Sequence, residues 1–219
     1  MQTLPIRART FAVALSFVAG FVDALGFLFS GGYFVSFMSG NTTNFAVRGA
    51  NLAGGVGIAA SLIALFVAGV VAASLIARTL PTTRRHMLVD LIAFLLALAA
   101  VVAALGPTLL TLALMPVAMG AMNTIFERNG EAPFGVTYMT GALVKFGQSL
   151  ATAISGGPKW NWTPHLMLWL GLVSGAFCGA LAFPYAGLQG LWLPVIALLA
   201  LGRVRLYDLN RPGTLSTSA

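Results

Sequence analysis

A polar, glycine-containing stretch interrupts the apolar sequence near the start of the chain. It reads GGYFVSFMSGNTTNFAVRG at Gly31–Gly49, between the apolar runs 10–30 and 55–78. An apolar run of roughly 20 residues can span a membrane, but a backbone that leaves the helix at membrane depth needs hydrogen-bond partners inside the protein. The stretch therefore predicts a broken or re-entrant short helix held between spanning helices.

A looser copy of this stretch returns about a hundred residues later, at 134–154. The sequence SFMSG at 36–40 aligns with TYMTG at 137–141. Upstream, GFVD at 20–23 aligns with GAMN at 120–123, one residue out of register. Because the matches fall in the same order in both places, we interpret the chain as an internal duplication.

The first stretch also resembles a known family. The residues GFVDALGFLFSGGYFVSFMSGNTTNFAV closely resemble the N-terminal signature of the YoaK-like family of bacterial membrane proteins, and the likeness extends from about Thr10 to Leu201. This resemblance implies a small, multi-pass protein of the bacterial inner membrane. It implies no reaction, because that family has no settled function, so the residues themselves have to indicate one.

The composition supports a membrane protein and argues against several other classes. Hydrophobic residues make up 58% of the chain and charged residues 8%, against roughly 25% charged in soluble domains. The net charge of +7 comes from basic residues mainly at segment ends, which is typical of membrane topology and not of nucleic-acid binding. Glu127 and Glu131 are expected on a solvated loop, and the single Cys178 allows no intrachain disulfide. We expect no metal site, no cofactor and no nucleic-acid partner.

Six segments are apolar enough to span the membrane, and they divide the chain into two repeats. We expect a basic N-terminal arm at 1–9, a first membrane repeat at 10–105, a second at 108–204 and a polar tail at 205–219. The fold class is thus an all-α integral membrane protein with about six spans and two broken or re-entrant short helices. The expected spans are 10–30, 55–78, 87–105, 108–126, 166–185 and 188–204.

The distribution of basic residues decides between two topologies. Cytoplasmic loops of membrane proteins carry an excess of Lys and Arg. With the N-terminus in the cytoplasm, a re-entrant stretch at 31–49 places Arg84 and Arg85 inside, whereas a spanning stretch places them outside. In the re-entrant topology both termini are cytoplasmic, Arg48 alone is misplaced, and the two repeats are inverted, as in many secondary transporters. Eight spans with parallel repeats are the rival topology.

Asp23 is the first candidate functional residue. A carboxylate in a membrane helix costs roughly 2.5–3.5 kcal/mol at mid-depth, so it should face the bundle interior or water. Ser16, Gly20 and Asp23 share one helix face, and the matching face of the second repeat carries Gly120 and Asn123. The alternative role for Asp23 is structural, as a cap for a neighbouring broken helix.

The two Ser/Thr-Gly turns are the second set of candidates. Serine, threonine and asparagine cap helix N-termini, and such an end carries roughly +0.5 of a charge and binds anions through backbone N–H groups. Two inverted broken helices would direct two such ends at one site near the membrane midplane. The alternative is that these residues only satisfy the backbone where the helix breaks. The candidates are Ser39, Gly40, Asn41, Thr42 and Asn44 in the first stretch, and Thr140 and Gly141 in the second.

Lys145 is the last candidate for substrate binding. It stands where the first stretch has Asn44, so the duplication leaves one acid, Asp23, and one base, Lys145, in opposite repeats. We expect these two side chains to approach each other across a central pocket. The alternative is that Lys145 extends to the membrane interface.

Transport is the function that this pattern indicates. Inverted repeats with paired broken helices predict a secondary transporter or permease for a small anionic solute, with proton coupling through Asp23. A passive channel, or a non-transporting module for assembly or lipid binding, is the alternative. The small residues Gly171, Gly175 and Gly179 indicate close helix packing and are compatible with a homodimer. No nucleophile with a positioned base is evident, so we do not expect an enzyme.

Overall fold

The structure is a computed structural model that describes residues 5–80, 86–106, 109–127 and 135–209, with side chains as far as Arg203. Arg84, Arg85, Glu131 and the outer parts of the expected arm and tail lie outside these residues. Every regular element in the described residues is a helix, as predicted. The elements are α1 (Ile6–Ser30), α2 (Met38–Ala50), α3 (Val56–Thr79), α4 (His86–Ala104), α5 (Leu109–Met122), α6 (Met139–Ile154), α7 (Thr163–Ala186), η2 (Gly187–Leu191) and α8 (Trp192–Leu209).

Four helical runs are long and apolar enough to cross a membrane: α1, α3, α4 and Thr163–Arg203, which joins α7, η2 and α8. α5 is apolar but has 14 residues, because the backbone leaves the α-helix at Asn123. The expected count of six spans is therefore not reached by length and composition. The three apolar runs expected at 10–30, 55–78 and 87–105 do form α1, α3 and α4.

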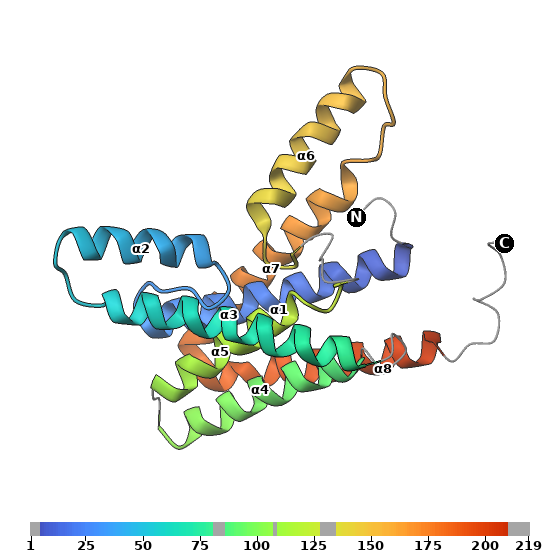
Figure 1. Cartoon of the computed structure of the whole chain (residues 1–219). Coiled ribbons are helices and arrows are strands. Elements are labelled where there is room, and N and C mark those ends of the chain that lie inside the picture. Colours follow the sequence, from blue (N-terminus) through green and yellow to red (C-terminus); the bar gives the residue numbers. More distant parts are fainter. Residues whose placement is uncertain (1–4, 81–85, 107–108, 128–134, 210–219) are drawn as a thin grey trace.

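The long helices pack in two crossing pairs, α1 with α7 and α5 with α3, and α4 and α8 pack beside them (Figure 1). In the first pair, Gly171 lies against Val13. Gly179 lies against Phe21 further along both helices, so α1 and α7 run in the same direction. α3 and α5 also share a direction, because α4 returns between them (Figure 1).

Glycines bring α1 and α7 into backbone contact. A side chain on Gly175 would collide with the carbonyl oxygen of Phe17. A side chain on Gly20 would collide with the carbonyl oxygen of Leu172. Small residues have this effect at helix interfaces in membranes, where close backbone approach supplies much of the attraction.

The α5–α3 pair has the same two contacts. Gly120 of α5 lies against the carbonyl of Phe66, and Gly69 of α3 lies against the carbonyl of Val117. Gly120 is the residue that the sequence alignment matches to Gly20. The two pairs therefore cross at corresponding glycines.

The segment after α1 turns back along that helix before α2 begins. Gly31 and Gly32 have φ angles of 72° and 115°, which glycine adopts without a steric penalty. The non-helical residues Val35 and Ser36 then lie beside Asp23, about two turns before the end of α1. The N-terminus of α2 is thus level with the interior of α1 and not with its end.

The 13-residue α2 then returns to the end at which α1 stops. Tyr33, just after α1, donates its hydroxyl to the carbonyl of Gly55, just before α3, at 3.1 Å. Arg48 near the end of α2 donates to the carbonyl of Gly54 at 2.9 Å and lies over the Tyr33 ring. Segment 31–55 therefore leaves and rejoins the long helices at one end, and α1 and α3 run in opposite directions.

α6 and α7 form a second helical hairpin, as α2 and α3 form the first (Figure 1). The two short helices, α2 and α6, lie on the outside of the long-helix bundle and do not pack side by side in this view. Each short helix follows a non-helical segment, and those segments contain the buried polar contacts described next.

Candidate functional site

Asp23 holds the non-helical segment 31–37, which leads into α2. Its Oδ1 accepts hydrogen bonds from the backbone N–H groups of Val35, at 2.8 Å, and Ser36, at 2.7 Å. The side chain is only 9% exposed. An unpaired backbone N–H in a membrane costs several kcal/mol, so a non-helical segment there needs such an acceptor. This geometry matches the structural role that the sequence left open for Asp23.

Asn123 has the equivalent position before α6. Its Oδ1 accepts from the backbone N–H of Thr137 at 3.2 Å. Its amide nitrogen donates to the Thr137 hydroxyl and to the carbonyl of Met119, both at 3.0 Å. In the sequence alignment Thr137 corresponds to Ser36. The backbone N–H of this residue is therefore bound by a carboxylate, Asp23, before α2 and by a neutral amide, Asn123, before α6.

Asn41 and Asn44 fix the turn before α2 from within the helix. Asn41 is fully buried, and its side chain both accepts from the N–H of Phe34 at 2.9 Å and donates to the Phe34 carbonyl at 2.6 Å. Asn44 donates to the carbonyl of Gly32 at 3.2 Å. Both amides therefore bind the backbone of the non-helical segment 31–37.

The expected capping of the short helices by Ser and Thr is not observed. The N-cap residues are Phe37 for α2 and Tyr138 for α6, and neither makes a side-chain cap. Ser39 and Thr140 fall inside the first turn and are exposed. An aromatic residue stands at each N-cap because its ring packs over the glycine three residues later, which has no side chain.

Gly40 and Gly141 make room for these rings. A side chain on Gly40 would meet the Phe37 ring, and one on Gly141 would meet the Tyr138 ring. The spacing of an aromatic residue three positions before the glycine is present in both stretches of the sequence. This spacing is the sequence signal from which the aromatic N-cap of each short helix could have been predicted.

Thr42 and Lys145 complete the predicted set. Thr42 is exposed and donates its hydroxyl to the carbonyl of Met38 in its own helix, at 2.9 Å. Lys145 is exposed on α6, within electrostatic range of His165 on α7. No hydrogen bond or ion pair joins Lys145 to Asp23, both of which the structure describes. Asp23 binds the backbone N–H groups of Val35 and Ser36 instead, and the approach of Lys145 to Asp23 across a pocket stays a prediction.

Glu127 is a buried residue whose environment the sequence did not indicate. It is 7% exposed and not on a solvated loop as expected. Its Oε2 accepts from the hydroxyl of Ser74 on α3 at 2.6 Å, which ties the chain after α5 to the neighbouring helix. Within the described ranges, no three His, Cys, Asp or Glu residues cluster in a way that could hold a metal ion.

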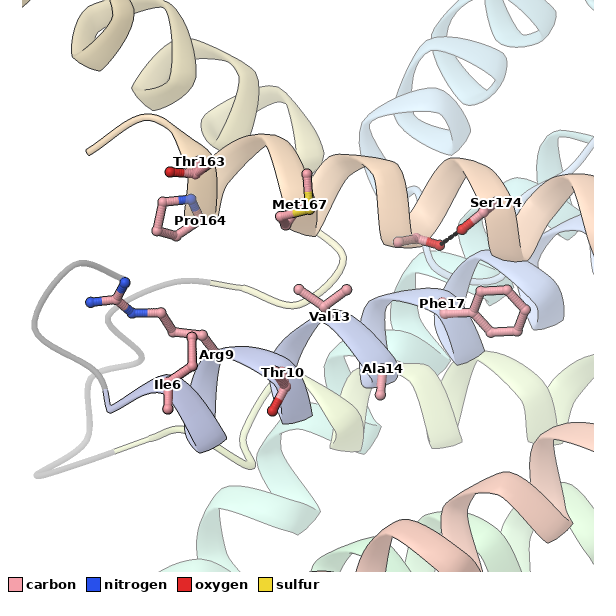
Figure 2. Close-up of a pocket in the computed structure, with 11 residues that line it drawn as sticks. Ile6, Arg9, Thr10, Val13, Ala14, Phe17, Thr163, Pro164, Met167 and Ser174 are labelled. Carbon is pink, nitrogen blue, oxygen red and sulfur yellow. Dashed lines mark hydrogen bonds between the residues drawn. The ribbon is translucent and has the colours of Figure 1, made fainter. Parts of the chain in front are cut away.

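A cavity lies between the N-terminal halves of α1 and α7, and we call it the α1–α7 groove. Its volume is about 570 Å³. Figure 2 shows Arg9 and Thr163 at one end of it, Val13 and Met167 in the middle, and Phe17 towards the other end. None of the predicted substrate-binding residues lines this groove.

Comparison with known proteins agrees with the membrane fold. The family model described as "Protein of unknown function (DUF1275)" matches residues 11–204. The chain belongs to the DUF1275 family. A UPF0700 transmembrane protein of Rhizobium meliloti (strain 1021) is 38% identical over 189 residues, which are 86% of this chain and 81% of that protein. No solved structure matches the chain.

The DUF1275 match reaches from α1 into α8 and so includes both short helices and their anchors. Together with the transmembrane relative, it confirms the resemblance to a family of membrane proteins of unknown function. The apolar helices and this relative identify a multi-pass membrane protein. The family description names no reaction or substrate, so a function has to be argued from the geometry.

Proposed function

We propose that this DUF1275 protein is a secondary transporter or permease for a small anionic solute, built from two inverted repeats. The observation that carries the proposal is the matched anchoring of two short helices, by Asp23 before α2 and by Asn123 before α6. Inverted repeats with interrupted helices are a recurrent construction of transporters, in which half-helix ends face a site near the membrane midplane.

The directions of the long helices support inversion. α1 and α3 run in opposite directions, because segment 31–55 returns to the end of α1. α3 and α5 run in the same direction (Figure 1). α5 therefore runs opposite to α1, as inversion of the second repeat requires. In this topology α5, α7 and α8 each cross the membrane, and α2 and α6 re-enter from opposite sides.

The basic residues support the same topology. Arg9 at the start of α1 and Arg78 at the end of α3 lie on the same side of the membrane in this topology, because these helices are antiparallel. Lys159 lies on this side of the membrane as well, because it precedes α7, which runs parallel to α1. An excess of Arg and Lys marks the cytoplasmic side, so both termini are cytoplasmic in this proposal, in the inner membrane of a bacterium. Arg48 lies on the other side, where the Gly54 carbonyl and the Tyr33 ring bind it.

The candidate residues divide into anchors and groups that are available to a solute. Asp23, Asn41, Asn44 and Asn123 hold the backbone of the two interruptions. The exposed groups lie in the first two turns of α2 and α6, whose N-termini favour anions. We assign solute contact to Ser39, Thr42, Thr140 and Lys145, around Gly40 and Gly141.

Cysteine accessibility tests the topology. Single cysteines would replace Gly32, Arg48 and Arg78 in a Cys178→Ser background, and an impermeant thiol reagent would be added from each side. We expect Gly32 and Arg48 to label from outside and Arg78 from the cytoplasm. Labelling of Gly32 and Arg48 from opposite sides would mean that segment 31–49 spans the membrane, and the inverted-repeat proposal would be abandoned.

Electrical recording on proteoliposomes tests the transport site. Jumps of acetate, phosphate and chloride would be applied to the wild-type protein, to Lys145→Met and to Lys159→Met, in which an exposed lysine outside α6 is lost. Lys145→Met should abolish any anion-dependent current, and Lys159→Met should retain it. Equal currents from the wild type and Lys145→Met would remove Lys145 from the solute site.

A further inference from the structure

The α1–α7 groove has one charged end and one apolar end. Arg9 and Thr163 lie at the charged end, and the groove continues past Val13 to Phe17 (Figure 2). Arg9 and Phe17 are eight residues apart on α1, so the groove follows about 12 Å of that helix. Such a cavity matches an elongated molecule with a charged head and an apolar tail.

The hydroxyl groups of Ser174 and Thr163, which line the groove, are bound within the protein. Ser174 donates to the carbonyls of Leu170 and Gly171 in its own helix, at 2.7 and 3.0 Å. Thr163, at the charged end, donates to the carbonyl of Trp160. The surface beyond Arg9 is therefore formed largely by side chains such as Val13 and Met167, which favour a hydrocarbon chain over a polar solute.

The charged end lies at the level expected for lipid headgroups. Trp160 and Trp162 precede α7 directly, and their ring centroids are 6.0 Å apart. Trp160 is 71% exposed. Tryptophan gathers where a membrane meets water, so Arg9 and Thr163 stand near the headgroups and Phe17 stands deeper in the hydrocarbon.

We propose that the α1–α7 groove binds one anionic phospholipid. Its phosphate lies at the Arg9 guanidinium, which offers N–H donors in a planar fork that fits phosphate oxygens. One acyl chain lies along Val13, Phe17 and Met167. This site goes beyond the proposed transport function and does not depend on it, because it requires only that α1 and α7 lie in a membrane.

The other helix pair provides an internal comparison for this assignment. When Gly20 is matched to Gly120, Arg9 corresponds to Leu109 of α5. When Gly175 is matched to Gly69, Gly171 corresponds to Leu65 of α3. The α5–α3 pair thus lacks the basic group and carries a side chain where the groove has a glycine.

Native mass spectrometry of the full chain in detergent tests the proposal. The probes are phosphatidylglycerol and phosphatidylcholine with identical acyl chains. We expect phosphatidylglycerol to be retained about five-fold more, the factor that one arginine near a membrane surface contributes. Arg9→Gln should bring this ratio close to one, whereas Arg203→Gln, which removes an exposed arginine in the C-terminal half of α8, should leave it unchanged.

A second pair of variants tests the apolar part of the groove. Met167 is 42% exposed and lines the groove, and Val173 has similar exposure on α7 but does not line it. Met167→Trp should lower retention of both lipids by filling the groove, and Val173→Trp should not. Melting temperatures in detergent confirm that each variant is folded.

Three results would overturn the proposal. The first is an unchanged lipid ratio in Arg9→Gln, which would remove the phosphate contact. The second is equal thermal stabilisation by phosphatidylglycerol and by glycerophosphoglycerol, its soluble headgroup, which would show a site for free phosphate esters. The third is a dimer mass that Met167→Trp abolishes and Val173→Trp retains, which would show that a second copy of the chain fills the groove.

Discussion

The α1–α7 and α5–α3 pairs share a crossing but differ on either side of it. At the crossing each pair has one glycine from each helix, Gly20 with Gly175 and Gly120 with Gly69. The row along α7 reads Gly171, Gly175 and Gly179, whereas the corresponding row along α3 reads Leu65, Gly69 and Ala73. Both pairs thus keep the glycine that allows backbone contact, and only the flanking positions vary.

The flanks of the α1–α7 pair add a contact that the other pair cannot make. Ser16 of α1 donates its hydroxyl to the carbonyl of Leu168 on α7, at 3.0 Å. The position that corresponds to Ser16 in α5 is Pro116, which has no hydroxyl. The two pairs therefore share the geometry of the crossing and differ in the chemistry beside it, including the groove with Arg9.

The anchors of the short helices differ in charge and not in placement. Asp23 accepts from two backbone N–H groups, and Asn123 accepts from one and also binds the Thr137 hydroxyl. A neutral amide therefore suffices to hold a broken segment against a long helix. The charge of Asp23 is more than the anchoring requires, which makes it the residue to test for a second role.

The largest expected effect is at the shared crossing. Gly20→Val and Gly120→Val each place a side chain against a carbonyl of the facing helix, which cannot move without moving that helix. We expect each to destabilise the protein by about 3 kcal/mol. Thermal unfolding in detergent measures this, with Gly49→Val as the control, because a Cβ at Gly49 meets nothing within 4 Å. If only one pair responded, the two crossings would not be equivalent.

Removal of the anchoring side chains Asp23 and Asn123 should have the second largest effect on stability. Asp23→Ala leaves the N–H groups of Val35 and Ser36 without their acceptor, and we expect a loss of about 2–3 kcal/mol. Asn123→Ala leaves one N–H group without an acceptor, and we expect about 1–2 kcal/mol. Equilibrium unfolding of both variants under the same conditions measures the difference. Equal losses would show that the second hydrogen bond to Asp23 contributes little.

Exchange of the two anchors separates charge from anchoring. Asp23→Asn keeps an acceptor for the backbone and should lower stability by about 1 kcal/mol, well below the loss for Asp23→Ala. If Asp23 couples protons to transport, this variant folds but loses the effect of a pH gradient on uptake, measured in proteoliposomes. Asn123→Asp is the matched control and should retain that effect. A full gradient response in Asp23→Asn would leave Asp23 with an anchoring role alone.

Local sequence pattern was sufficient to predict much of the fold. The apolar runs before Ser30, before Thr79 and before Ala104 form helices where expected, because a long apolar run in a membrane has few alternatives to a helix. α5 was predicted too long, because the backbone turns at Asn123 to meet Thr137, a contact across a loop that hydropathy does not record.

Contacts between distant segments could not be predicted in the same way. The sequence singled out Asp23 as a buried acid, but it does not show that the N–H groups of Val35 and Ser36 are its partners and that Lys145 is not. The carboxylate of Glu127 binds Ser74, and the groove beside Arg9 exists because α1 packs on α7. Each of these features depends on which helices become neighbours, and a single sequence does not specify that.

The smallest expected effect concerns the hydrogen bond that only the α1–α7 pair makes. Ser16→Ala removes the hydroxyl that donates to the Leu168 carbonyl. That carbonyl lies inside α7, where a backbone N–H of the same helix also donates to it. Loss of the Ser16 hydroxyl therefore leaves no unpaired acceptor. We expect about 0.6 kcal/mol, the average for such bonds between membrane helices. Thermal unfolding measures it against Ser61→Ala, an exposed serine of α3. A loss as large as that for Gly20→Val would mean that this bond, and not the glycine crossing, holds α1 against α7.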